Sequence, residues 1–265
     1  MSDETQPRIS LTVESRDNET PMPPRQSANT LFRFFGKIDY LLQAIERRAL
    51  VPRYYGENVE YLEIDHTTIA YPMICFCDIT VHRLQSHLDV YGEYGIAFSK
   101  PWGIAHGIQP LQYINKYSVL RKDFSAAFTS AMKEEGRTDT ADFLLTQMLF
   151  IKPIEGIMRR DDKDIQKNFT DECEWRFIPN VSQIDLPLII AEEDTASSGV
   201  LNDTIETHEQ CWLKFDLSDV KYIIIKTEDD FESLCSLVNR TVDDETTRLH
   251  LISKVIIWNN AREDF

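Results

Sequence analysis

The sequence predicts an α+β protein in which a mixed, mostly antiparallel sheet carries an inserted layer of helices. Short apolar strand patterns alternate with stretches of helical spacing, and the chain contains no internal repeat and no coiled-coil heptad run. Of its 265 residues, 42% are hydrophobic, which is enough for a large core without metals or disulfides. We therefore expect one domain over residues 29–265.

Residues 1–28 have a different composition, rich in Thr, Ser, Asp, Glu and Pro and poor in large apolar side chains. Such a segment cannot bury enough apolar surface to fold, so we expect a disordered acidic and polar tail. Its beginning lacks the basic and apolar regions of a signal peptide, and the chain contains no run of about 18 apolar residues. The five cysteines are an odd number, typical of reduced thiols. The sequence thus predicts a cytoplasmic protein without a membrane span.

The net charge is the unusual property of the composition. The chain has 44 acidic and 28 basic residues and a formal charge of −16. This charge repels phosphate backbones and anionic membrane surfaces, so direct nucleic-acid binding is not expected. A basic protein partner is compatible with it.

Apolar spacing predicts the secondary structure of the first half of the chain. Pro52 ends the first helical pattern, because it keeps the preceding residue out of the α region. The expected elements are a strand or turn at 31–35, a helix at 37–48, an extended segment at 51–55, strands at 74–78, 95–99 and 111–114, a short helix at 80–89 capped by Thr80, and a helical turn at 102–106.

The second half begins with two helical patterns, 118–133 and 140–151, which form the predicted helical layer. Charged and Ser/Thr-rich stretches are typical of loops. The remaining expected elements are a charged loop at 159–167, strands at 172–178, 212–215, 220–225 and 253–258, a surface loop at 191–207 and a helix at 229–239.

Glu172, Glu174 and Arg176 are the first candidate site residues, and they alternate with apolar residues on one predicted strand. Side chains two apart share a strand face, so we expect an exposed polar face, with Trp175 pointing inward. One interpretation is a solvated surface. The other is a catalytic pair, in which one carboxylate polarises a hydroxyl and the other sets its electrostatics.

Arg53, Ser99 and the two glutamates occur in an order that resembles NAD-using ADP-ribosyltransferases. The resemblance implies an ADP-ribosyltransferase-like fold, with NAD as cofactor and an oxocarbenium-like transition state. In that reading Arg53 contacts the phosphates, Ser99 positions the ribose and Glu174 is catalytic, with Glu172 as its partner. The Ser-Thr-Ser triplet of that family is absent.

Four further residues complete the candidate cofactor site. His87 and Tyr91 would line the cleft, and Lys100 and Arg176 would add positive charge. Cys75 and the cysteine two residues later lie near His82 and His87 in the sequence, but no metal site is expected, because histidines five residues apart do not share a helical face.

Six motifs follow one another along the chain: Ile74-Cys-Phe-Cys-Asp-Ile79, Tyr91-Gly-x-Tyr-Gly-Ile-Ala-Phe-Ser-Lys-x-Trp-Gly103, Gly107-Ile-x-Pro-x-x-Tyr113, Lys152-Pro-x-Glu-Gly156, Asp171-Glu-x-Glu-Trp-Arg-Phe-Ile-Pro179 and Val220-Lys-Tyr-Ile-Ile224. In this order they resemble the AbiGi family of abortive phage-resistance proteins, which is described as an antitoxin family. The resemblance covers residues 31–265.

The AbiGi resemblance implies bacterial phage defence and a toxin partner of nucleotidyltransferase type. Two hypotheses follow, an antitoxin or regulatory component that binds this toxin, and an ADP-ribosyltransferase or NAD glycohydrolase-like effector enzyme. Under either hypothesis we expect Arg53, Ser99 with Lys100, and the two glutamates to converge on one cleft, with a glutamate in salt-bridge reach of Arg53 or Lys100. The sequence leaves open the target, the phage trigger and the oligomeric state.

Overall fold

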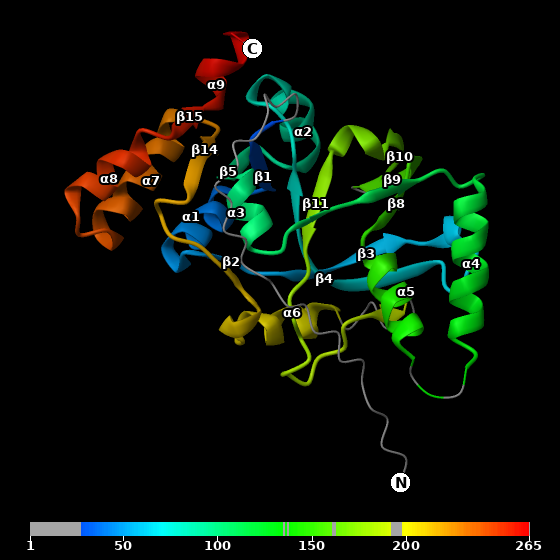
Figure 1. The fold of residues 1–265 in the computed structure, drawn as a ribbon. Helices are drawn as coiled ribbons and strands as arrows, with labels where there is room; N and C mark the ends of the chain where they lie inside the picture. Colours follow the sequence, from blue (N-terminus) through cyan, green and yellow to red (C-terminus); the bar gives the residue numbers. More distant parts are fainter. Residues whose placement is uncertain (1–27, 135, 137, 161–162, 192–197, 265) are drawn as a thin grey trace, which may run out of the picture. The chain divides into compact units, whose positions relative to one another are not determined.

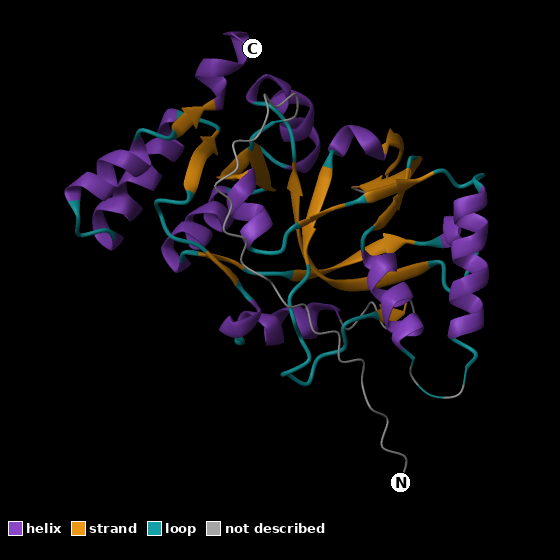
Figure 2. Ribbon diagram, in the orientation of Figure 1, coloured by secondary structure: helices purple, strands orange, loops and turns teal. Residues whose placement is uncertain are grey.

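The computed structural model describes residues 28–134, 136, 138–160, 163–191 and 198–264. Helices and short strands alternate along them, as Figures 1 and 2 show, and the predicted α+β class is confirmed. Their contacts form two compact units that interleave along the sequence. The first unit comprises described residues of 52–73 and 109–211, and the second those of 28–51, 74–108 and 212–264. Apart from residue 28, the predicted tail lies outside the described residues.

The second unit is built on strands in the order β15-β14-β5-β1, with the end of β4 beside β1. All these pairings are antiparallel except that of β14 with β15. The strand bounds are β1 Thr30–Phe35, β2 Ala49–Leu50, β4 Thr68–Cys77, β5 Tyr94–Ser99, β13 Leu213–Lys214, β14 Val220–Ile225 and β15 Val255–Ile257.

Helices pack on this sheet, and α1 contacts α7. Phe32, Phe98 and Ile223 are fully buried in the core, and the ring of Phe98 stacks on Trp102 with centroids 4.1 Å apart. The helices of this unit are α1 Ile38–Arg47, α2 Leu84–Tyr91, α3 Lys100–Ala105, α7 Glu228–Thr241, α8 Glu245–Ile252 and α9 Trp258–Ala261, with short 3-10 turns η2 Val81–Arg83 and η6 Arg262–Asp264.

The first unit holds the start of β4, which pairs antiparallel with β3 and β12. The remaining strands form three short ladders, β11 with β6, β7 with β8, and β9 with β10. The strand bounds are β3 Arg53–Asn58, β6 Gln109–Pro110, β7 Gln112–Ile114, β8 Ile151–Pro153, β9 Glu155–Arg160, β10 Lys163–Asn168, β11 Glu174–Phe177 and β12 Ile190–Ala191.

Helices α4 and α5 of the first unit pack on each other, as the predicted helical layer requires. Side-chain oxygens cap both helices, since Ser118 accepts from the N–H of Arg121 and Thr138 from that of Ala141. The helical segments are α4 Val119–Ala131, α5 Asp139–Leu149, α6 Ser198–Glu206, η1 Glu60–Leu62, η3 Phe169–Glu172 and η5 Glu209–Cys211.

Two predicted loops are instead regular structure. Residues 159–167 belong largely to the antiparallel hairpin β9–β10, because cross-strand pairing satisfies the backbone of this charged stretch; 161–162 lie outside the described residues. Within the predicted loop 191–207, α6 contacts β3 and buries Ile205, while 192–197 lie outside the described residues. Helix α8 was not predicted. No helix in the described part of the chain is long and apolar enough to cross a membrane.

Candidate functional site

The two predicted glutamates lie on either side of a change in backbone conformation. Glu172 ends the 3-10 turn η3, and Glu174 begins β11. Between them Cys173 adopts the left-handed conformation, with φ 44° and ψ 49°. This conformation is uncommon for a residue with a side chain and is typical of positions that the surroundings fix. Here it joins the turn to the strand with both carboxylates close together.

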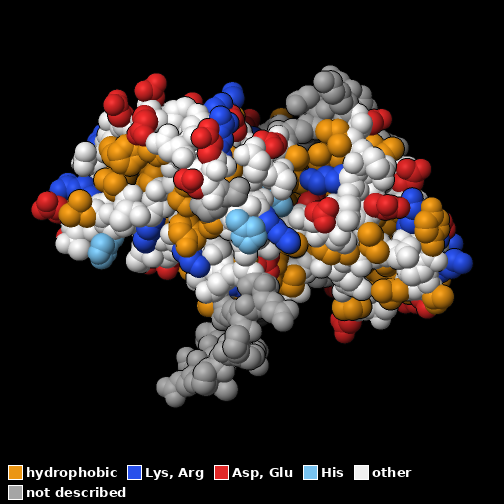
Figure 3. Space-filling model, turned by 90° about the horizontal axis from the view of Figure 1, so that it is seen from above, with side chains coloured by type: hydrophobic (Ala, Val, Ile, Leu, Met, Phe, Trp, Pro, Cys, Tyr) orange, Lys and Arg blue, Asp and Glu red, His pale blue; other side chains and the backbone are white. Residues whose placement is uncertain are grey.

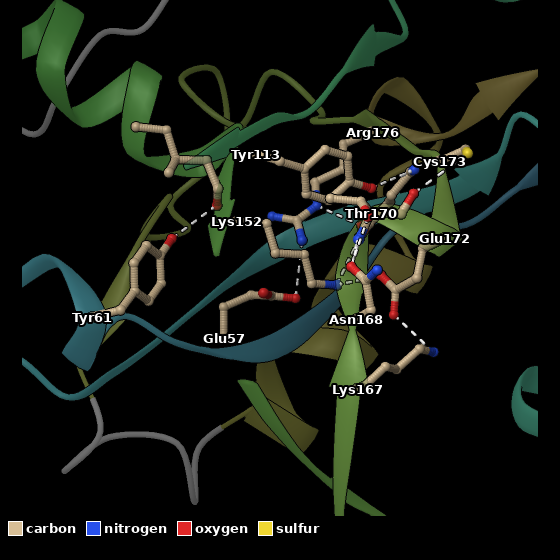
Figure 4. Close-up of polar contacts among 12 residues, drawn as sticks. Glu57, Tyr61, Tyr113, Lys152, Lys167, Asn168, Thr170, Glu172, Cys173 and Arg176 are labelled. Atoms are coloured by element: carbon tan, nitrogen blue, oxygen red, sulfur yellow. Dashed lines mark hydrogen bonds and ion pairs between the residues drawn. The ribbon is translucent and has the colours of Figure 1, made fainter. Parts of the chain in front are cut away.

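Lys152 of β8 joins the two carboxylates (Figure 4). Its Nζ donates to Oε2 of Glu172 at 2.7 Å and to Oε2 of Glu174 at 2.8 Å. The same ammonium lies 4.8 Å from the ring centroid of Phe169, within cation–π range. One largely buried cation therefore holds two carboxylates that would otherwise repel each other.

Arg176 extends this cluster through the interior of the first unit, and its side chain is 0% exposed. Its Nε donates to Oε1 of Glu174 at 2.7 Å, and one terminal nitrogen donates to the hydroxyl of Tyr71 and to the carbonyl of Leu149. The other terminal nitrogen lies 3.1 Å from a carboxylate oxygen of Glu57. The planar fork of the guanidinium thus connects β11 with β3 and β4.

A third cation, Lys167 of β10, lies 2.9 Å from Oε1 of Glu172. The network therefore contains three acidic and three basic side chains, which balance formally. Such pairing is required, because an unpaired charge is very costly to bury. We call this group the buried charge network, and it consists of Glu57, Lys152, Lys167, Glu172, Glu174 and Arg176.

The pKa shifts follow from this arrangement. Burial alone raises the pKa of Glu174, but the adjacent Arg176 and Lys152 outweigh burial and hold that pKa far below its usual range. Burial lowers the pKa of Lys152, but the carboxylates of Glu174, Glu57 and Glu172 raise it well above its usual value. Both groups are therefore ionised near neutral pH.

The prediction of an exposed polar face on this strand was wrong. Glu174 is 5% and Arg176 0% exposed, whereas Trp175, which we expected inside, is only half-buried. Neighbouring strands supply the countercharges that make the polar face the inner one. Alternation shows which residues share a face, but not which face is buried.

The other predicted residues of the first unit lie differently. Arg53 is exposed at the start of β3, opposite Met73 of β4, and the ion pairs of Glu174 are to Lys152 and Arg176 rather than to Arg53. Within the described residues, therefore, Glu174 is neutralised by Arg176, which was assigned to the site, and by Lys152, which was not.

The remaining predicted residues belong to the second unit. Ser99 caps α3 by accepting from the N–H of Trp102, and Nζ of Lys100 lies 2.5 Å from Oδ2 of Asp78. His87 is buried on α2, and its ring centroid lies 6.0 Å from that of Phe34 and 6.0 Å from that of Tyr91. The expected shared cleft between these residues and the two glutamates stays a prediction. Among the described residues no cluster of three or more His, Cys, Asp or Glu side chains could hold a metal ion.

Sequence reasoning missed Glu57, Lys152 and Lys167 as members of this site. A signal existed for Lys152, which opens the motif Lys152-Pro-x-Glu-Gly156, but spacing alone did not link that motif to the glutamates. Glu57 carried no signal, because it meets the network only through tertiary packing. Lys167 closely precedes Glu172 in the sequence, but it lies in a stretch that was predicted to be a charged loop.

Comparisons with known proteins define the class as abortive phage resistance. A family model described as "Putative abortive phage resistance protein AbiGi, antitoxin" matches residues 48–226. The "Abortive phage resistance protein AbiGi" of Lactococcus lactis subsp. cremoris is 34% identical over 248 residues, covering 82% of this chain and 100% of the relative. The chain belongs to the AbiGi family. No solved structure matches it.

Proposed function

We propose that this protein is the antitoxin or regulatory component of an abortive-infection defence and acts by binding a toxin protein. The observation that carries the proposal is the family match, whose description names an antitoxin and which spans both units of the fold. The AbiGi resemblance implies a toxin of nucleotidyltransferase type as the partner.

The charge of the chain supports a protein partner with a basic surface. At −16 the protein attracts cationic surfaces over a distance of about 10 Å at moderate salt. Acidic side chains are spread over the face shown in Figure 3, with basic and apolar ones between them. Such a field speeds association with a basic partner and makes its rate sensitive to salt.

The buried charge network supports binding over NAD chemistry. A catalytic carboxylate must reach the substrate, whereas Glu174 is buried and its oxygens accept from Lys152 and Arg176. A carboxylate held in this way is suited to fixing the ends of β8 and β11. Its role in the proposal is to maintain the fold that the partner recognises.

We expect the native locus to contain a neighbouring toxin gene of nucleotidyltransferase type, and the test is co-expression with that gene. We expect the antitoxin to restore growth of toxin-expressing cells and to co-purify with the toxin. Raising the salt concentration should slow association more than it speeds dissociation, because long-range attraction acts on the encounter. Failure to suppress toxicity, together with separate elution at low and high salt, would overturn the proposal.

A parallel assay distinguishes the enzyme hypothesis from the antitoxin proposal. The purified full chain, incubated with NAD alone and with NAD plus host lysate, should neither release nicotinamide nor modify proteins. Glu174→Gln is not a clean probe, because the substitution also disturbs the fold. Arg53→Gln is a better one, since Arg53 is exposed; NAD turnover that this change abolishes would favour the enzyme.

A further inference from the structure

The hairpin β9–β10 forms a ladder of its own in the first unit. Its register runs from Glu155 opposite Asn168 to Arg160 opposite Lys163, and β9 and β10 form a separate two-stranded sheet. A two-stranded ribbon is marginal in water unless one face packs on something else. The hairpin must therefore be held at its base.

Two contacts hold that base to the rest of the first unit. Lys167 reaches Glu172 of the buried charge network. A Cβ on Gly156, directly opposite Lys167, would lie only 3.0 Å from the ring of Phe169, so the backbone of β9 packs closely on this ring. The face that contains Gly156 and Lys167 is therefore the inner face.

The opposite face of β9 is exposed to solvent. Side chains alternate along a strand, so this face contains Glu155 and Ile157, and both are exposed. Ile157 exposes 63% of its surface, among the largest values for a large apolar residue in the described chain. An exposed β-branched residue in the middle of a strand favours pairing with another strand.

The outer edge of β9 is open within the part of the chain that the structure describes. Its ladder partner is β10, and its outward backbone groups make no further hydrogen bond with described residues. Such an edge is a template for a strand from another chain. The interaction it offers is backbone pairing, with the side chains deciding the partner.

The charges along β9 favour a second copy of the same strand. The hairpin, residues 155–168, contains four acidic and four basic residues, so it is neutral on a chain of −16. In an antiparallel pair centred on Ile157, the register places position 155 of each copy opposite position 159 of the other. A glutamate is therefore paired with an arginine at two places in the dimer. Strand β10 lacks this property, because pairing centred on Ile165 would place Lys163 opposite Lys167.

We propose that β9 pairs antiparallel with β9 of a second copy about a two-fold axis at Ile157. The product is a four-stranded ribbon in the order β10-β9-β9-β10. One strand from each copy makes a small interface, so the dimer is weak and depends on concentration. This inference concerns self-association and is independent of the toxin partner.

Sedimentation equilibrium of the full chain tests the proposal over about a hundredfold range of concentration. The parent chain should shift from monomer to dimer across this range. Ile157→Lys should remain monomeric, because a lysine on an open edge opposes strand pairing. Val200→Lys on α6, a matched change at another exposed β-branched residue of the same unit, should leave the dimer unchanged.

Charge reversal tests the register. Glu155→Arg and Arg159→Glu should each weaken the dimer about tenfold, since each places like charges opposite one another twice. An equimolar mixture of the two variants should form a heterodimer of parental strength, because every opposing pair is again of opposite sign. Circular dichroism and thermal unfolding confirm that each variant is folded. A parent that stays monomeric, a dimer that persists in Ile157→Lys, or a mixture that fails to associate would each overturn the proposal.

Discussion

Nε of Arg176 lies 2.7 Å from Oε1 of Glu174, two residues earlier on β11, and both side chains are buried. Neighbours two apart on a strand face do not usually pair so closely away from water, because the desolvation of each charge is costly. Here Lys152 and Glu57 complete the pairing on either side. We therefore expect the stability of the first unit to depend strongly on Glu174.

Glu174→Gln should lower the free energy of unfolding by about 3–5 kcal/mol, because it leaves Arg176 and Lys152 undercompensated in a buried site. Urea unfolding followed by circular dichroism measures this loss. The control is Glu46→Gln, which removes an exposed ion pair in which a carboxylate oxygen of Glu46 lies 3.3 Å from a guanidinium nitrogen of Arg240. This change should lower the free energy of unfolding by less than about 1 kcal/mol. Equal decreases in the free energy of unfolding of the two variants would show that the buried ion pairs stabilise the fold no more than the exposed one.

The free energy of unfolding should decrease as the pH is lowered into the acid range. The folded state lowers the pKa of Glu174 from its ordinary 4.5, so this group stabilises the fold fully above that value, and its contribution is lost as the pH falls below it. Unfolding in urea at a series of pH values from neutral downward measures the slope. Glu174→Gln should show a shallower acid-side slope, while Glu46→Gln keeps that of the parent. If Glu174→Gln leaves the slope of the free energy of unfolding against pH unchanged, Glu174 is not the source of the acid-side loss of stability.

Gly92 should tolerate no side chain. Its φ is 123°, and a Cβ there would lie 2.2 Å from the carbonyl oxygen of Phe35, too close for any backbone. Gly92→Ala should therefore cost at least about 2 kcal/mol in the free energy of unfolding. Gly36→Ala is the matched control in the same unit, because nothing lies within 4 Å of its Cβ position. Thermal unfolding should separate the two variants, and similar midpoints would refute this account.

Cys173 offers a test of the junction between Glu172 and Glu174. Glycine adopts the left-handed conformation without cost, so Cys173→Gly should retain parental stability to within about 1 kcal/mol. Valine is β-branched and disfavours it, so Cys173→Val should be the less stable of the two by about 1–2 kcal/mol. Chemical unfolding of both variants checks the order. The reverse order would mean that packing of the side chain, rather than the backbone conformation, determines which residue is most stable at this position.

Local pattern determined much of the fold. The helix begun by Ile38, the strand that ends at Ser99 and the helical pair α4–α5 all follow from apolar spacing and caps within a few residues of one another. The same holds for α7, where Thr227 and Asp230 form a capping box. These elements were predictable because the information that specifies them is local.

The candidate site was only partly predictable. Sequence spacing placed Glu172, Glu174 and Arg176 together, since period two fixes a shared strand face. Whether that face meets water or protein depends on what the neighbouring strands bring to it, and this is not encoded in the spacing. The hairpin β9–β10 was missed for a related reason, because its charges resemble a loop until the two strands pair.

The sequence by itself determined the α+β class, the family and the grouping of the two glutamates with Arg176. Only the tertiary structure decided that this grouping is buried, because Glu57, Lys152 and Lys167 reach it from three other strands and supply the charges that make burial possible. Burial of a charge is a property of all its neighbours at once, whereas periodicity reports only on the strand that carries it.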